Sequence, residues 1–91
     1  MAAERVRVVY SGTVQHVGFR ARSVDASRGI AVTGFVRNLP DGRVELVAEG
    51  ARADVERLLA AVRERLGYLI ARADASWSAA SGEFRDFTAR R

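Results

Sequence analysis

The sequence has no cysteine, and this absence excludes disulfide bonds, zinc–thiolate sites and cysteine nucleophiles. It has one histidine, His16, so a metal site built from several histidines is excluded as well. All 15 basic residues are arginines, and the lack of lysine removes Schiff-base chemistry. Arginine binds phosphate oxygens through a planar fork of N–H groups. We therefore expect no metal and no cofactor. The arginine-rich composition suits a ligand that carries phosphate.

Long apolar runs are also missing. No segment approaches the roughly 18 consecutive apolar residues that cross a bilayer, and residues 1–10 lack the apolar core of a signal peptide. We expect a soluble, cytoplasmic protein that binds no membrane. The 91 residues, 48% of them apolar, suffice for one compact domain over residues 1–91 and not for two cores.

The net charge of +4 raises the question of nucleic-acid binding, because arginine-rich surfaces displace counterions from phosphates. The arginines, however, are spread from Arg5 to Arg91 and alternate with 11 acidic residues. Such a distribution is typical of a solvated surface of mixed charge. We expect no nucleic-acid partner.

The first third of the chain predicts a strand, a loop and a helix. Apolar and charged residues alternate over residues 5–10, the pattern of a strand with one buried face. Residues 11–19 have two glycines and no helical period, so we expect a loop. Ala21, Val24 and Arg28 recur at helical spacing and predict a helix over residues 20–29.

The middle of the chain predicts a hairpin followed by a second helix. Residues 33–39 and 43–50 resemble strands, and Pro40-Asp41-Gly42 between them favours a tight turn. The clearest amphipathic stripe in the sequence then predicts a helix, with Gly67 as its C-terminal stop. Its apolar positions are Val55, Leu58, Leu59, Val62 and Leu66.

Patterning weakens towards the end of the chain, where residues 71–77 and 83–88 can supply further strand around a turn at residues 78–82. The predicted order is strand, helix, strand, strand, helix, strand, with a fifth short strand possible. This is the α+β, ferredoxin-like βαββαβ sandwich, an antiparallel sheet with both helices on one face. The fold hosts enzymes, RNA binders and regulatory modules, so function has to be argued from a site.

One candidate site is the segment Gly12-Thr-Val-Gln-His-Val-Gly-Phe-Arg20, which joins a strand to the start of a helix. Backbone N–H groups and the positive end of the helix dipole favour an anion there. Gly12 and Gly18 permit unusual dihedral angles, so that successive N–H groups can turn inward as a nest. Arg20, in the first helical turn, can add two charge-assisted bonds to phosphate.

A second segment follows, Gly34-Phe-Val-Arg-Asn38-Leu-Pro-Asp-Gly42-Arg-Val44. Together the two segments resemble the acylphosphatase family, whose patterns are Gly-x-Val-Gln-Gly-Val-x-Phe-Arg and Gly-aromatic-Val-Arg-Asn-x-x-Asp-Gly-x-Val. The resemblance runs from about residue 6 to residue 50 and continues more loosely through the helix over residues 55–66. It implies a metal-free hydrolase that converts acyl phosphates to a carboxylate and inorganic phosphate.

The resemblance also implies the site residues. Arg20 would bind the phosphoryl group, and Asn38 would orient the attacking water. The backbone N–H groups of the first segment would form the phosphate-binding loop, whose members are Gln15, His16, Val17, Gly18, Phe19 and Arg20. Without the resemblance, the residues favour a different interpretation of Asn38, in which its amide serves the turn that follows it.

Three positions depart from the family pattern. His16 replaces the second glycine of the loop, which predicts strain if that position needs a positive φ. Ala31 replaces the glycine after the first helix, with Gly29 two residues earlier, so the helix could end sooner. Tyr68 replaces the proline that usually follows Gly67, and the tail from Ala71 onward matches poorly.

We expect a monomer that acts on a small-molecule acyl phosphate. Two other functions remain open at this point: an RNA-binding ferredoxin-like domain and a catalytically silent regulatory domain. RNA binders of this fold display stacking aromatic residues on their central strands, whereas residues 43–49 hold no aromatic residue and two acids. A silent domain would follow if His16 disrupted the loop.

Overall fold

A computed structural model describes residues 2–91, which form a five-stranded sheet in the order β4-β1-β3-β2-β5. Strands β1 to β4 pair antiparallel, as the alternating sequence pattern predicts. Strand β5 instead runs parallel to β2, so the sheet is mixed and the expectation of an antiparallel sheet holds for four strands of five. The strands are β1 (Glu4–Gly12), β2 (Thr33–Asn38), β3 (Val44–Gly50), β4 (Ile70–Ala79) and β5 (Phe87–Arg90).

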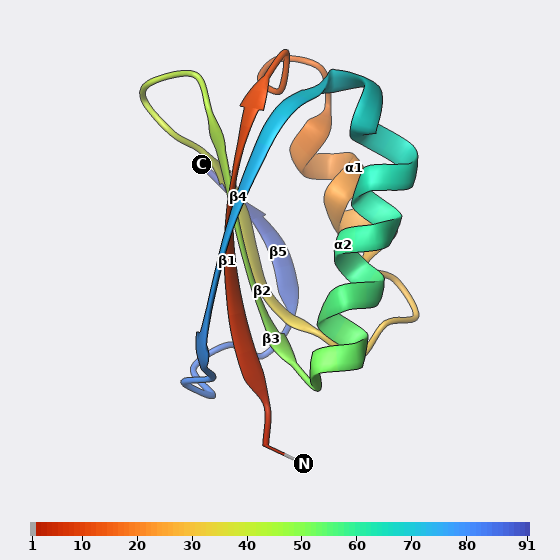
Figure 1. Cartoon of the computed structure of the whole chain (residues 1–91), viewed down its shortest axis with the longest axis vertical. Coiled ribbons are helices and arrows are strands. Elements are labelled where there is room, and N and C mark those ends of the chain that lie inside the picture. Colours follow the sequence, from red (N-terminus) through yellow and green to blue (C-terminus); the bar gives the residue numbers. More distant parts are fainter. Residues whose placement is uncertain (1) are drawn as a thin grey trace.

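Two helices, α1 (Phe19–Ala26) and α2 (Arg52–Leu66), cover the same face of this sheet, and the other face carries no helix (Figure 1). This is the predicted ferredoxin-like sandwich. The core lies between the helices and the two central strands, where alternate residues of β1 and β3 are less than 5% exposed. Among residues 2–91, neither helix is long and apolar enough to cross a membrane.

Helix α2 confirms the amphipathic stripe read from the sequence. Val55, Leu58, Val62 and Leu66 are fully buried, and Leu59 is half-buried at the side of the stripe. The helix ends at Leu66 as predicted, and Gly67 follows it. Gly67 keeps a right-handed φ of −56° and begins a short 3₁₀ turn, so it does not use the left-handed conformation that glycine allows.

Helix α1 differs from its prediction in length. It ends at Ala26 rather than near Gly29, and just after it the Ser27 hydroxyl donates to the carbonyl of Val24 at 2.6 Å. Ala21, one of the two apolar residues whose spacing predicted the helix, is exposed. The buried residues of α1 are Phe19, Ser23 and Ala26, so the apolar spacing predicted the helix but did not mark its buried face.

The C-terminal third also differs in its boundaries. Strand β4 continues to Ala79, through the start of the predicted turn, and residues 83–86 lie outside any strand. Glu49 of β3 fixes this connection by accepting hydrogen bonds from the backbone N–H groups of Ser81 (2.9 Å) and Gly82 (3.0 Å). Strand β5 then enters the sheet beside β2 and brings the chain end to the same end of the molecule as the β1–α1 loop and the β2–β3 turn (Figure 1).

Candidate active site

A pocket of about 230 Å³ lies at this end of the molecule, between the β1–α1 loop, the end of β2 and β5. It brings together five of the predicted site residues, from segments separated by a whole helix: His16, Gly18, Phe19, Arg20 and Asn38. Gln15 and Val17 belong to the same loop but do not line the pocket. The complete lining is Val14, His16, Gly18, Phe19, Arg20, Ala21, Asn38 and Ala89.

The shape of the loop depends on three positive φ angles. Gly12 has φ 128°, and a Cβ atom there would lie 2.5 Å from the carbonyl oxygen of Leu69, so only glycine fits. Gly18 has φ 76° and directly precedes α1. His16 has φ 63°, the only positive φ at a residue other than glycine within residues 2–91. The family's glycine position thus does require a left-handed backbone, as the sequence comparison suggested.

The loop leaves its backbone donors unpaired. Thr13 N–H bonds to the carbonyl of Leu69 at 3.0 Å, but the N–H groups from Gln15 to Arg20 meet no acceptor within residues 2–91. The first turn of α1 also has no side-chain cap and no acidic residue. Unpaired N–H groups at a helix N-terminus favour an anion, because their partial positive charges add to the helix dipole.

The side chain of Gln15 holds the loop in place. Its Nε2 atom donates to the carbonyl oxygen of Leu39 at 2.7 Å and to that of Arg43 at 2.9 Å, on both sides of the β2–β3 turn. The loop is thereby tied to the hairpin that carries Asn38. This role was not predicted, since the sequence places Gln15 in the loop but says nothing of which carbonyl groups it reaches.

Arg20, half-buried in the first turn of α1, contributes to the lining of the pocket from the helix side. Its Nη1 atom donates to the backbone carbonyl of Arg90 at 2.8 Å, and no carboxylate pairs with it among residues 2–91. One edge of the guanidinium is therefore oriented by β5 while its charge stays uncompensated. This contact was also missed from the sequence, because a backbone carbonyl 70 residues away leaves no sequence signal.

Asn38 is the last residue of β2 and is half-buried. Its amide makes no hydrogen bond within residues 2–91. The turn after it is closed instead by Leu39 N–H to the Arg43 carbonyl at 2.8 Å and by the Asp41 carboxylate, which accepts from Arg43. The hydrogen bond from the Arg43 N–H, and then the Arg43 guanidinium, lower the pKa of Asp41. The turn therefore does not use the Asn38 amide.

The electrostatic character of the pocket follows from these residues. No carboxylate lines it, and its ionisable side chains are Arg20 and His16. A guanidinium and a neutral amide in the lining of one cavity, beside a loop whose N–H groups are unpaired, can together hold a tetrahedral anion and hydrogen-bond a second small molecule beside it.

Comparisons with known proteins agree with this geometry. The family model described as Acylphosphatase matches residues 6–89. The chain is 45% identical over 91 residues to the acylphosphatase of Methylococcus capsulatus, covering 97% of each chain. It is 44% identical over 87 residues to that of an Anaeromyxobacter species, covering 94% of each. The crystal structure of acylphosphatase from Bacillus subtilis superposes with a TM-score of 0.87 at 26% identity, over 97% of this chain and 99% of that one.

Proposed function

The chain belongs to the acylphosphatase family and is a hydrolase of that class, and we propose that it cleaves acyl phosphates in the pocket lined by Arg20 and Asn38. The observation that carries this proposal is that two polar side chains without an acidic or amide partner line one pocket, beside a loop whose N–H groups are unpaired. They are the guanidinium of Arg20, which pairs with no carboxylate, and the amide of Asn38.

The loop and Arg20 hold the phosphoryl group in this proposal. Two or three phosphoryl oxygens accept hydrogen bonds from the N–H groups between Gln15 and Arg20 and from the free edge of the Arg20 guanidinium. These donors stand in place before the reaction, so they stabilise charge on the equatorial oxygens of a loose transition state without reorganising. The bond from Arg20 to the Arg90 carbonyl supports the proposal by fixing the plane of the fork.

Asn38 places the nucleophile. Its amide oxygen accepts a hydrogen bond from a water molecule and aligns it for attack on phosphorus, opposite the acyl oxygen. The new P–O bond forms as the bond to the acyl oxygen breaks, and the carboxylate leaves with the electron pair. A carboxylate is a good leaving group, so no general acid is needed, and the proton of the water passes to a phosphoryl oxygen. No metal or cofactor takes part.

A steady-state assay with benzoyl phosphate tests the proposal directly. We expect release of benzoate and inorganic phosphate, with turnover unchanged after exhaustive chelation. Turnover that is lost in chelator and restored by a divalent ion would contradict the metal-free mechanism. An RNA titration run beside it separates the alternatives: saturable RNA binding without hydrolysis favours a binding domain, and neither activity favours a silent one.

A further inference from the structure

A second hollow lies between α2 and the edge strand β4, on the helix side of the sheet. Two adjoining cavities of about 360 and 510 Å³ form it, and both are lined by Leu59 and Arg63. We call it the α2–β4 groove. It is separate from the candidate active site, because the ring of Tyr10, which lines the groove, packs against Phe19, which lines the other pocket, at 5.2 Å between centroids.

The floor of the groove is apolar and open to solvent. Ala73 and Ala75 pair with Tyr10 and Val8 across the β1–β4 ladder and so face the helix layer, yet both alanines are exposed. Helix α2 therefore leaves this strip of β4 uncovered. Leu59, half-buried on α2, forms the opposite wall. An apolar strip on the inner face of a sheet is normally covered, and here the fold supplies no cover.

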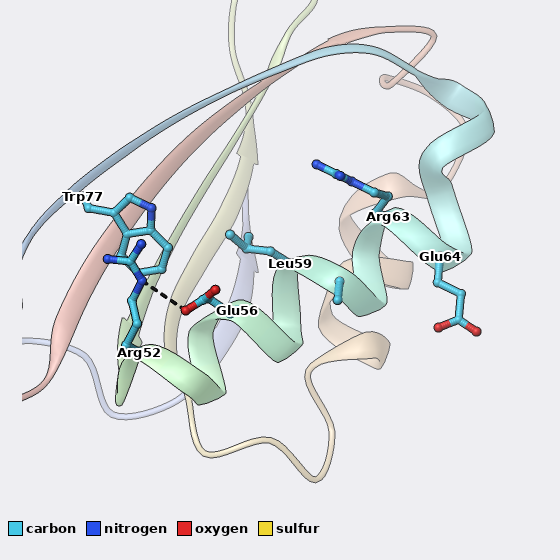
Figure 2. A pocket seen from close by; sticks show the side chains of 7 residues that line it. Arg52, Glu56, Leu59, Arg63, Glu64 and Trp77 are labelled. Atoms are coloured by element: carbon cyan, nitrogen blue, oxygen red, sulfur yellow. Dashed lines mark hydrogen bonds and ion pairs between the residues drawn. The ribbon is translucent and has the colours of Figure 1, made fainter. Parts of the chain in front are cut away.

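Where the two cavities meet, two hydrogen-bond donors have no acceptor within residues 2–91. One is the exposed Arg63, which lines both cavities, extends from α2 toward the strands (Figure 2) and forms no ion pair within residues 2–91. Glu64 also lines the larger cavity, but its side chain extends in a different direction from that of Arg63 (Figure 2). Tyr10 is only 4% exposed, and its hydroxyl meets no partner in that same part of the chain. Burial raises the pKa of Tyr10 to about 12, against the opposing effect of the Arg63 charge, so the phenol stays a donor at neutral pH.

An ion pair of the protein itself occupies the Trp77 end of the groove. The guanidinium of Arg52 stacks on the indole of Trp77, 3.5 Å from the ring centroid, and pairs with Glu56 at 3.2 Å (Figure 2). From Ala73 to Trp77 the strand spans about 14 Å at the usual rise per residue. The groove is thus an elongated apolar strip with an unpaired guanidinium where its two cavities meet and an aromatic end whose arginine is already paired.

We propose that the α2–β4 groove binds a monocarboxylate with a medium-length alkyl chain. The carboxylate accepts from the Arg63 guanidinium and the Tyr10 hydroxyl, and the chain lies over Ala73, Ala75 and Leu59 towards Trp77. A single unpaired guanidinium matches a single negative charge, because the other two arginines that line the groove, Arg52 and Arg72, pair with Glu56 and Asp74. A phosphate dianion would need further unpaired donors. A cationic amphiphile is disfavoured by Arg63.

Trp77 is the only tryptophan in the sequence, so its fluorescence reports on the groove. Titration with decanoate below its micelle concentration should change this emission saturably. Decanol, which keeps the chain and loses the charge, should bind at least about tenfold more weakly, as expected for loss of a charge-assisted bond. Decyltrimethylammonium should not bind. Equal affinity for all three amphiphiles, or no saturable change with decanoate, overturns the proposal.

Substitutions test where the carboxylate and the alkyl chain of the ligand bind. Arg63→Gln should weaken decanoate binding at least about tenfold, and Tyr10→Phe, which removes only an unpartnered hydroxyl, about fivefold. Ala75→Leu fills the floor and should abolish binding. The matched controls are Arg57→Gln on the same helix, where Arg57 pairs with Asp54, and Ser76→Leu on the opposite face of β4. Losses in these controls equal to those in the groove variants count against the site.

Decanoate binding in the groove must also be distinguished from binding in the candidate active site, because the expected product of hydrolysis there is also a carboxylate. Arg20→Ala should leave decanoate affinity unchanged, and inorganic phosphate should not compete with decanoate. If phosphate displaces decanoate, or Arg20→Ala abolishes its binding, the ligand occupies the Arg20 pocket and the groove proposal is wrong. Failure of decanoate binding would leave the proposed hydrolysis untouched, since no step of it uses Arg63 or Tyr10.

Discussion

Arginine is used in opposite ways on the open face of the sheet and in the candidate active site. On the open face, the carboxylate of Glu45 on β3 lies between Arg7 of β1 at 2.5 Å and Arg37 of β2 at 2.6 Å. Glu49, further along β3, accepts from Arg5 at 2.6 Å. Both glutamates are about 4% exposed, and each meets a guanidinium from a neighbouring strand.

The pocket at the end of the sheet is different, because the protein supplies no acid there. Arg20 meets only a backbone carbonyl, and the loop N–H groups before it meet no acceptor among the described residues. A hydrogen bond to a charged group such as the Arg20 guanidinium contributes about 1.5–3 kcal/mol when its acceptor is supplied. In the proposed function the phosphoryl group supplies that acceptor, whereas the glutamates of the open face already have their partners in the protein.

The largest effect is expected at Arg20. Arg20→Ala should lower acyl phosphate turnover at least about a hundredfold and weaken inhibition by inorganic phosphate, because it removes the main charge opposite the phosphoryl group. Arg20→Lys should recover little, since an ammonium cannot reproduce the planar fork. The measurement is kcat/KM for benzoyl phosphate and Ki for phosphate, on variants shown to be folded by circular dichroism.

The matched control is Arg7→Ala, which removes an arginine whose partner is Glu45 on the open face. We expect this variant to keep near wild-type turnover and to lose stability instead. If Arg7→Ala and Arg20→Ala behave alike, the distinction between paired and unpaired arginines has no functional meaning.

Asn38→Ala should affect the reaction more than binding. In the proposed mechanism the amide places water and does not hold the phosphoryl group, so we expect about a hundredfold loss of kcat with competitive phosphate inhibition nearly intact. Steady-state kinetics with and without phosphate separate the two parameters. Normal kcat at saturation with weakened phosphate binding would instead make Asn38 a binding residue.

Elements with many buried residues could be predicted from the sequence, whereas elements with few buried residues were harder to predict. Helix α2 and the β2–β3 hairpin were predicted because buried stripes and turn residues constrain the sequence locally. Strand β4 was harder to recognise: eight of its ten residues are exposed, so no apolar alternation marks it, and the groove beside it could not be foreseen. Short α1 has few buried positions, and its apolar spacing did not mark its buried face.

In the candidate site, too, some features could be predicted from the sequence and others could not. Arg20, Asn38 and the loop stand in two recognisable segments, so a resemblance could find them. Gln15 and Arg20, by contrast, donate to backbone carbonyl groups that the fold brings near them. Because every residue type has a backbone carbonyl, nothing in the sequence identifies these partners, and only a structure reveals them. The parallel pairing of β5 with β2, which delivers the Arg90 carbonyl, likewise depends on the whole sheet.

A smaller effect, on stability, is expected at Glu49. Burial by itself raises the pKa of this carboxyl, but the N–H groups of Ser81 and Gly82, followed by Arg5, outweigh it and bring the pKa to about 2. The folded pKa lies below the ordinary value of 4.5, so the stabilisation is complete above about pH 4.5 and is lost as pH falls towards 2. Glu49→Gln should cost about 2 kcal/mol at neutral pH.

Urea unfolding between pH 2 and pH 7 measures this effect. Wild type should lose stability below about pH 4.5 more steeply than Glu49→Gln, because the variant lacks the titrating carboxyl. Glu64→Gln is the control, since Glu64 is exposed on α2 and forms no ion pair within residues 2–91. Parallel pH curves for wild type and Glu49→Gln would mean that Glu49 is not the group responsible.

The smallest effect is expected at His16, which tests whether the pocket tolerates strain. Its φ of 63° lies in the left-handed region, which costs an ordinary residue about 1 kcal/mol and glycine almost nothing. His16→Gly should therefore stabilise the protein by up to about 1 kcal/mol and leave activity equal or higher. His16→Ala is the decisive companion, because it removes the imidazole but keeps the Cβ atom that causes the strain. Strain relief predicts a gain for glycine and none for alanine, with activity kept in both. An imidazole that contacts the phosphate predicts loss of activity in both variants. That second pattern would show that His16 adds a contact to the anion site beside Arg20.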